Sequence, residues 1–87
     1  MLKVTKAASE YLNDLLVRMQ APSDAAVRIV PKVDGGGLAT TIDQERDGDE
    51  RFDCEGRTVL VLDSQIADAL TEQTLDVGEN GQRLVIS

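Results

Sequence analysis

The sequence offers few side chains that could carry chemistry, and the most reactive of them is a lone cysteine. Cys54 is the one thiol in 87 residues, and the chain contains no histidine. The absence of histidine removes the commonest general base, the commonest metal ligand and every Ser-His or Cys-His nucleophile pair. Asp53 and Glu55 flank the thiol with negative charge, which disfavours the thiolate. The sequence therefore predicts either a buried small apolar side chain or an exposed, unreactive thiol at Cys54.

A second candidate is the glycine triplet in VDGGGLATT, residues 33–41. Backbone N–H groups of Gly35, Gly36 and Gly37 could approach a phosphate, but the stretch matches neither G-x-G-x-x-G nor the Walker pattern, and no lysine follows it closely. We expect a tight turn between two strands, with positive φ at one or more of these glycines. Asp34, beside the triplet, is the one acidic residue that we name as a candidate ligand for a hard cation such as iron.

The acidic stretch DQERDGDE, residues 43–50, superficially resembles a calcium loop. It matches EF-hand positions 1, 3, 5 and 6 with Asp43, Glu45, Asp47 and Gly48. The pattern then fails, because Cys54 stands at the twelfth position, where a bidentate glutamate is needed, and no helices flank the loop. We expect these residues to form the solvated tip of a tight Asp-Gly hairpin.

The charge balance excludes several classes of partner. Nine basic and sixteen acidic residues give a net charge of -7, which repels nucleic-acid phosphates and anionic membranes. No apolar run approaches the roughly 20 residues that span a bilayer, and the N-terminal residues look like a strand rather than a signal peptide. We therefore expect a cytoplasmic protein that binds neither nucleic acid nor membrane. A chain of this length forms one domain, residues 1–87, for which dimerisation would add buried area.

A helix near the N-terminus is the clearest element that the sequence predicts. A short strand at 2–4 precedes Thr5, a good N-cap, and the helix runs to about Met19 before Pro22 ends it. Apolar residues recur at the spacing of one buried helix face: Ala8, Tyr11, Leu12, Leu15, Leu16 and Met19. A second, short helix is expected from Asp63 and Ser64, which can cap it, to about Leu70.

The remaining segments predict strands at 26–33, 38–44, 51–54, 58–62, 74–77 and 83–86. Pro31 indicates an edge or a bulge in the first of these, and the unbroken apolar run TVLVL at 58–62 indicates burial on both faces. Turns are expected at Glu55-Gly56 and at Asn80-Gly81, the latter of type I′. The order β-α-β-β-β-β-α-β-β predicts an α+β domain with mostly antiparallel sheets of about seven short strands, one amphipathic N-terminal helix and one short second helix.

Over its whole length the chain resembles the HesB/IscA-like family, the A-type iron-sulfur cluster carriers. The resemblance begins in LKVTKAASEYLNDLL, with its strand, threonine cap and helix alanine at Ala8, and continues through Arg28. It extends to DSQIADALTEQTLD, where the family spacing is kept by Asp63, Leu70, Leu75 and Asp76. The resemblance implies a HesB-like fold.

The residues that the resemblance would make cluster ligands are missing. The family carries Gly-Cys-Ser-Gly where this chain reads Gly35-Gly36-Gly37, so the first ligand cysteine falls on Gly36, with one residue deleted. Gly35 and Gly37 look like retained turn glycines, and Asp34 to Gly37 form a degenerate ligand loop. The family also ends in a Cys-x-Cys tail, whereas this sequence ends at Ile86-Ser87, so we expect no tail ligands. An iron-sulfur cluster normally needs four thiolates, some replaceable by imidazole.

These observations lead to two alternative functions. The first is a HesB/IscA-like domain that has lost cluster ligation, is not an enzyme, needs no cofactor, and acts as a non-catalytic binding or interaction module linked to iron-sulfur protein biogenesis. The resemblance implies a homodimer, and iron-sulfur assembly proteins or their clients, as partners. The second is an iron or iron-sulfur cluster carrier that uses Cys54 across a homodimer, with Asp34 or Asp53. An enzyme would require a close, buried pair of carboxylates in a cleft.

Overall fold

The computed structural model describes residues 1–32, 37–78, 81 and 83–87. Within these ranges, two helices and seven strands follow one another in the predicted order: β1 (Lys3–Val4), α1 (Lys6–Arg18), β2 (Ala25–Pro31), β3 (Leu38–Gln44), β4 (Glu50–Cys54), β5 (Arg57–Leu62), α2 (Ser64–Ala69), β6 (Thr74–Val77) and β7 (Leu84–Ile86). The predicted α+β class is confirmed. No helix in the described ranges is long and apolar enough to cross a membrane.

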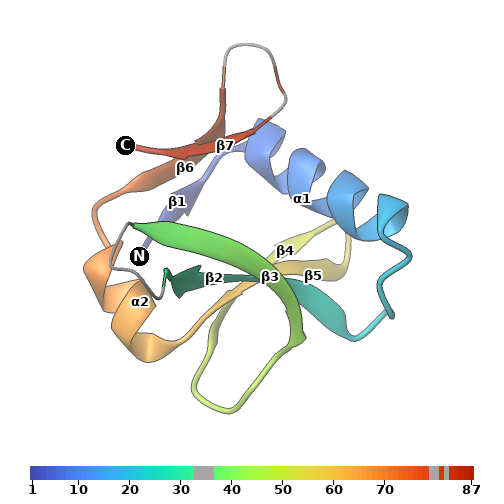
Figure 1. Ribbon diagram of the computed structural model, residues 1–87, viewed down its shortest axis with the longest axis horizontal. Coiled ribbons are helices and arrows are strands. Elements are labelled where there is room, and N and C mark those ends of the chain that lie inside the picture. Colours follow the sequence, from blue (N-terminus) through green and yellow to red (C-terminus); the bar gives the residue numbers. More distant parts are fainter. Residues whose placement is uncertain (33–36, 79–80, 82) are drawn as a thin grey trace.

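The strands form two separate sheets, which Figure 1 shows with α1 and α2 on opposite sides of the molecule. The four-stranded sheet has the order β3-β2-β5-β4, and the three-stranded sheet has the order β1-β6-β7. Three of the pairings are antiparallel, whereas β2 with β5 and β1 with β6 are parallel. Both sheets are therefore mixed, with antiparallel pairs in the majority.

Helix α1 closes the core between the two sheets. It contacts β6 of one sheet and β2, β4 and β5 of the other, and it buries Ala8, Leu12 and Leu16. Met19 was predicted on this buried face but is 62% exposed, because it is the C-cap of the helix rather than part of its last full turn. The core is completed by aliphatic side chains from β2, β5, α2 and β6.

The ends of α1 are fixed by hydrogen bonds. The Thr5 hydroxyl accepts from the backbone N–H of Ala8 at 3.1 Å, which confirms the predicted N-cap. At the other end, Gln20 adopts φ +54, its N–H donates to the carbonyl of Val17, and the N–H of Ala21 donates to the carbonyl of Leu16. This pair of bonds is a Schellman motif. The chain thus leaves the helix at Gln20, before the proline to which the helix end had been attributed.

Strand β2 lies inside its sheet, yet it tolerates Pro31 at its end. The pairing of β2 with β5 joins Val27 to Leu60 and Arg28 to Val61, so Pro31 has a neighbour on one side, in β3. The next residue, Lys32, donates its N–H to the carbonyl of Gly37 at 2.9 Å. Because the ladder alternates, the missing N–H of Pro31 is on the side away from β3. The prediction of a local edge at this proline is confirmed.

The hairpin predicted at Asp47-Gly48 is wrong. Residues 46–49 do form a turn, with Asp49 N–H bonded to the carbonyl of Arg46, but the strands on either side of it are not neighbours. β3 and β4 lie at opposite edges of the four-stranded sheet, so the connection crosses the end of the sheet instead of reversing the chain (Figure 1). The tight two-residue hairpin is at Glu55-Gly56, with φ +53 and +82, between β4 and β5.

The predicted burial of TVLVL on both faces is confirmed for residues 59–62, which form the inner part of β5 and are fully buried. Asp63 caps α2 as expected, since its carboxylate accepts from the N–H of Ile66 at 2.9 Å. The predicted turn at Asn80-Gly81 lies partly outside the described residues, because Asn80 is not among them.

Candidate functional site

The glycine triplet stands between β2 and β3 in the sequence, and the described residues nearest to it, Lys32 and Gly37, lie at one end of the four-stranded sheet. Asp34, Gly35 and Gly36 lie outside the described residues. Gly37 is exposed and has φ +105, a backbone conformation that favours glycine. The predicted positive φ is therefore confirmed at Gly37. The backbone N–H of Lys32 donates a hydrogen bond to the carbonyl of Gly37.

Cys54 lies at the other end of the same sheet. It is the last residue of β4, pairs with Arg57 at the start of β5, and is half-buried against the apolar core. Since β5 runs parallel to β2, the start of β5 is opposite the end where Lys32 and Gly37 meet. At 3.3 Å per residue the separation along the sheet is about 25 Å. Cys54 and Gly37 of one chain therefore lie too far apart to contact the same metal ion.

The side chains do not fit an iron-sulfur cluster. Four cysteine or histidine ligands are normally required, and the chain provides the single thiol of Cys54. In the parts of the chain that the structure describes, no three cysteine, aspartate or glutamate side chains gather closely enough to hold a metal ion.

The acidic stretch instead forms a cluster of ion pairs around Arg28. The Arg28 guanidinium donates to Asp49 from Nη1 at 3.1 Å and Nη2 at 2.6 Å, and to Asp43 from Nε at 3.1 Å. Arg46 donates a further bond to Asp43 at 2.7 Å. The side chains of Arg28 and Asp49 are 5% and 4% exposed. The loop that was predicted to be solvated is exposed at residues 45–48, but both acids bonded to Arg28 are held against the sheet.

These contacts shift the ionisation of each group in the cluster. Hydrogen bonding to Asp49 raises the pKa of Arg28, and the same bond lowers the pKa of Asp49 despite its burial. The pKa of Asp43 is lowered chiefly by the backbone N–H of Gln44, and then by the charges of Arg46 and Arg28. All three groups are charged at neutral pH. The cluster therefore has a structural role, because both carboxylates that could act as a base are already paired with arginine.

One feature of the sequence, a single arginine in an apolar strand, indicates this cluster, although it belongs to none of the motifs considered above. Arg28 stands in the otherwise apolar strand AAVRIVP, and a buried guanidinium needs carboxylate partners. The nearest acid-rich segment in the chain is 43–50. Linking the two requires knowing that β3 pairs with β2 and places Asp43 beside Arg28.

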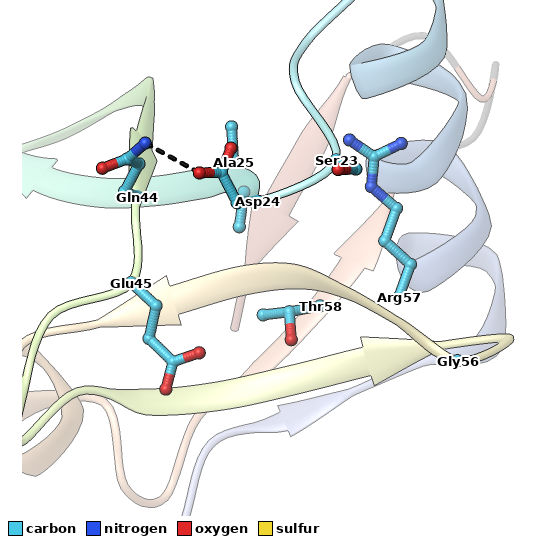
Figure 2. Close-up of a pocket in the computed structure, with 9 residues that line it drawn as sticks. Ser23, Asp24, Ala25, Gln44, Glu45, Gly56, Arg57 and Thr58 are labelled. Atoms are coloured by element: carbon cyan, nitrogen blue, oxygen red, sulfur yellow. Dashed lines mark hydrogen bonds between the residues drawn. The ribbon is translucent and has the colours of Figure 1, made fainter.

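A cleft of about 580 Å³ opens where β2 and β5 separate, and Figure 2 shows the residues that line it. Its lining comes from the turn before β2, the end of β3 and the start of β5: Ser23, Asp24, Ala25, Ala26, Gln44, Glu45, Gly56, Arg57 and Thr58. The pairing of β2 with β5 begins only at Val27 and Leu60. The cleft therefore occupies the unpaired beginnings of two parallel strands.

The cleft presents opposite charges on its two sides. On one side the amide of Gln44 donates to Asp24 at 2.9 Å, and Glu45 lies nearby; on the other side is Arg57 (Figure 2). Arg57 donates from Nη2 to the carbonyl of Pro22 at 3.1 Å, while its buried Nε has no hydrogen-bond partner. Such a site suits a polar segment or molecule that carries both a cationic and an anionic group. Sequence reasoning did not find it, because its residues come from three separate segments.

Solved structures share this architecture. SufA of Escherichia coli, a protein involved in the biosynthesis of iron-sulfur clusters, superposes with a TM-score of 0.70 at 23% identity, over 99% of this chain and 81% of that one. The chain has the SufA fold. IscA with a [2Fe-2S] cluster has the same fold, with a TM-score of 0.61, 16% identity, and coverage of 99% and 81%.

A protein from Aquifex aeolicus, solved by NMR, also has the SufA fold, with a TM-score of 0.65, 25% identity, and coverage of 99% of this chain and 89% of that one. No protein-family model and no curated protein matches the sequence. The expectation of a HesB-like fold is confirmed, and the likeness to SufA and IscA supports the resemblance that the sequence suggested.

Proposed function

We propose that this protein is a HesB/IscA-like domain that has lost iron-sulfur cluster ligation and acts as a non-catalytic binding module associated with iron-sulfur protein biogenesis. The observation that carries the proposal is the position of its one thiol. Cys54 lies in a chain with the SufA fold, but about 25 Å along the sheet from Lys32 and Gly37, the described residues nearest in sequence to the position where the family resemblance places a ligand.

The packing of Cys54 also supports this proposal. Its side chain is half-buried and packs against the core, as a small apolar group would. Asp53, the alternative partner named for it, already accepts a hydrogen bond from the Thr58 hydroxyl at 2.8 Å. Cluster ligation would require Cys54 to leave a packed position and Asp53 to leave its partner.

The absence of a cofactor and of enzyme activity is part of the same proposal. The best-defined group of carboxylates in the described residues is the one around Arg28, and its two acids are neutralised by arginines. The cleft between β2 and β5 is the surface that we assign to partner binding. Its two-sided charge favours a partner segment that carries both signs, such as an exposed loop of an assembly protein or a client.

The proposal is tested by offering the protein a cluster from a loaded donor. Purified SufA carrying a reconstituted cluster is mixed anaerobically with this protein, the two are separated, and the visible spectrum and iron content of each are measured. We expect the cluster to stay with SufA, because the recipient lacks thiolate ligands. Transfer of a cluster to this protein would overturn the proposal. Loss of that transfer in Cys54→Ser would then establish the alternative, a carrier that uses Cys54.

The binding half of the proposal is tested by NMR. The ¹⁵N-labelled protein is titrated with an unlabelled iron-sulfur assembly protein, and we expect shifts of the backbone signals around Ala26 and Thr58. Arg57→Glu should weaken the interaction at least ~10-fold, since it reverses one charged side of the cleft. Lys6→Glu, the same change in an exposed residue of α1, is the matched control. Equal effects of the two variants would argue against the cleft as the binding surface.

A further inference from the structure

Arg57 lines the cleft between β2 and β5 with most of its hydrogen-bonding capacity unused (Figure 2). Its side chain is half-buried, and a guanidinium carries several N–H groups. One of these, on Nη2, donates to the carbonyl of Pro22 at 3.1 Å. The buried Nε has no hydrogen-bond partner among the residues that the structure describes. A buried donor without a partner is unfavourable, so the free chain leaves Arg57 incompletely satisfied.

The bond from Arg57 to Pro22 can be broken at little cost. The carbonyl of Pro22 also accepts from the N–H of Ala25 at 3.0 Å, so it keeps a partner when Arg57 leaves. A carboxylate is a stronger acceptor for a guanidinium than a neutral carbonyl is. A guanidinium that turns into the cleft can offer Nε and one Nη to the same carboxylate, in a bidentate pair. Arg57 therefore gains hydrogen bonds by leaving Pro22 when a carboxylate is present.

The acidic side of the cleft has less unused capacity. Asp24 accepts from the amide of Gln44 at 2.9 Å, and Glu45 Oε1 lies 3.7 Å from Arg51 Nη1. Both acids are exposed to water, where an added ion pair contributes little to binding. Arg57 is half-buried, and an ion pair that is shielded from water is stronger. The anchor for a ligand is therefore Arg57 rather than the acids.

The acids around the cleft select which anions can reach Arg57. Asp24 and Glu45 line the cleft, and Asp53 binds the hydroxyl of Thr58, another lining residue. With the net charge of -7, these carboxylates repel a multiply charged anion such as a phosphate. A single carboxylate with a cation near it is repelled least. The cleft therefore favours a ligand that carries both groups.

The lining of the cleft favours an extended segment of chain. The cleft occupies the unpaired beginnings of β2 and β5, and three of its lining residues are small: Ala25, Ala26 and Gly56. Little side chain therefore separates a ligand from the backbone of the sheet. An extended segment has free backbone groups that can bond there, whereas a helix has already paired its own.

The strand register gives the spacing between the anchor and the acids. Val27 of β2 pairs with Leu60 of β5. Three positions earlier in each strand, Asp24 and Arg57 lie at the same level. Glu45 continues β3 at that level on the other side of β2. Two strand spacings of about 4.8 Å separate Glu45 from Arg57 by at least about 10 Å, the length of about three extended residues.

We propose that the cleft binds an extended segment of a partner protein by one carboxylate, which Arg57 holds with Nε and one Nη after leaving Pro22. A lysine or arginine about three positions away in the segment binds Asp24 and Glu45. Ser23 also lines the cleft and brings a hydroxyl donor for the carboxylate. This inference rests on the proposed function, which assigns the cleft to partner binding, and it names the chemistry of the partner.

The first test follows the Nε–H signal of Arg57 by ¹⁵N NMR in the wild-type protein. The probe is the blocked peptide acetyl-Lys-Ala-Ala-Glu-amide, which has its charges at the proposed spacing. A peptide with glutamine for glutamate is the control, and the same control with a free C-terminal carboxylate distinguishes a terminal carboxylate from a side-chain one. We expect the Nε proton to move downfield with a carboxylate peptide and not with the control, because it gains a hydrogen bond. A signal that neither carboxylate peptide moves at millimolar concentration would overturn the proposal.

The second test measures the dissociation constant of the carboxylate peptide for four variants. Arg57→Gln should raise it at least ~10-fold, and Arg57→Lys at least ~5-fold, because an ammonium group cannot bind a carboxylate side-on. Asp24→Asn should raise it about threefold, since the acidic side is exposed. Arg18→Gln, the matched change in an exposed arginine of α1, should stay within about twofold of wild type.

Urea unfolding of each variant checks that the fold is retained, and the wild-type Nε–H signal needs no variant. Equal weakening by Arg57→Gln and Arg18→Gln would overturn the proposal. A larger effect of Asp24→Asn than of Arg57→Gln would also overturn it, because the anchor would then be on the acidic side.

Failure of this inference can be distinguished from failure of the proposed function, because the peptides contain no iron-sulfur protein. Carboxylate peptides that move the Arg57 signal, together with assembly proteins that do not bind, would support the anchor and contradict the link to iron-sulfur protein biogenesis. An assembly protein that shifts Ala26 and Thr58 but leaves the Arg57 Nε–H signal in place would support partner binding and overturn the anchor.

Discussion

Arg28 and Asp49 form a bidentate ion pair, with nitrogen-to-oxygen distances of 3.1 and 2.6 Å between side chains that are almost fully buried. Arg28 belongs to an inner strand of the four-stranded sheet, whereas Asp49 ends the segment that crosses from β3 to β4. The pair therefore holds a connection that no strand pairing stabilises. Asp43, at the end of β3, binds the same guanidinium and fixes the beginning of that connection.

Removing one partner of this pair should be costly. Asp49→Asn leaves a buried guanidinium with Asp43 as its remaining carboxylate, and we expect the free energy of unfolding to fall by about 3 kcal/mol. The melting temperature should fall by more than about 10 °C for a chain of this size. Asp47→Asn, an exposed residue of the same turn, should change stability by less than about 0.5 kcal/mol. Equal effects of the two changes would show that the pair does not hold the connection.

The same pair predicts how stability depends on pH. The hydrogen bonds from Arg28 lower the pKa of Asp49 in the folded protein below its unfolded value of about 3.9. The stabilisation is therefore fully present above about pH 5 and is lost as the pH falls through the folded pKa. The difference in unfolding free energy between wild type and Asp49→Asn should be constant from about pH 7 to 5 and should shrink below about pH 4. Urea titrations across this range measure it; a difference that grows in acid would contradict the assignment.

The C-terminal end of α1 offers a stabilising substitution. Gln20 holds φ +54 within the Schellman motif, a conformation that costs a residue with a Cβ atom more than it costs glycine. Gln20→Gly should raise the free energy of unfolding by about 0.5 to 1 kcal/mol. Gln20→Ala keeps the Cβ atom and should show no such gain. Thermal unfolding of wild type, Gln20→Gly and Gln20→Ala measures the difference. A Gln20→Gly variant that is no more stable than Gln20→Ala would contradict the Schellman motif at this end of α1.

At the other end of α1, Thr5 joins the helix to the three-stranded sheet. Its hydroxyl accepts from Ala8 N–H and donates to Asp76 Oδ1 at 2.8 Å. Thr5→Ala removes both bonds and should lower stability by about 1 to 2 kcal/mol. It should also raise the pKa of Asp76, which the N–H of Val77 and then this hydroxyl hold down. Thr5→Ser keeps the hydroxyl and should behave like wild type in denaturant unfolding and in NMR titration of Asp76. A Thr5→Ser variant as unstable as Thr5→Ala would show that the hydroxyl does not cap the helix.

Local patterns predicted most of the elements, because each depends on neighbouring residues. The spacing of Ala8, Leu12 and Leu16 fixed the buried face of α1, and the run at 59–62 fixed the inner strand β5. The Asp47-Gly48 signal failed for the same reason. A turn is local, but the partner of a strand is not, and β3 pairs with β2 while β4 pairs with β5.

The sites were harder to predict than the fold. The position of Cys54 relative to Lys32 and Gly37 depends on the parallel pairing of Val27 with Leu60, which no motif in the sequence reveals. The ion pairs of Arg28 likewise join residues 15 and 21 positions apart in the chain. The resemblance supplied the scaffold, and the structure added the separation of Cys54 from Lys32 and Gly37.

The loss of cluster ligation is tested most directly by anaerobic reconstitution. The purified protein and its Cys54→Ser variant are incubated with ferrous iron, sulfide and thiol, desalted, and analysed for iron, acid-labile sulfide and visible absorption, with SufA treated in parallel. The account predicts that wild type and variant retain equally little iron and sulfide and show no cluster absorption, since four thiolates are not available to one chain or to a dimer. Stoichiometric iron and sulfide in the wild type, lost in Cys54→Ser, would contradict it.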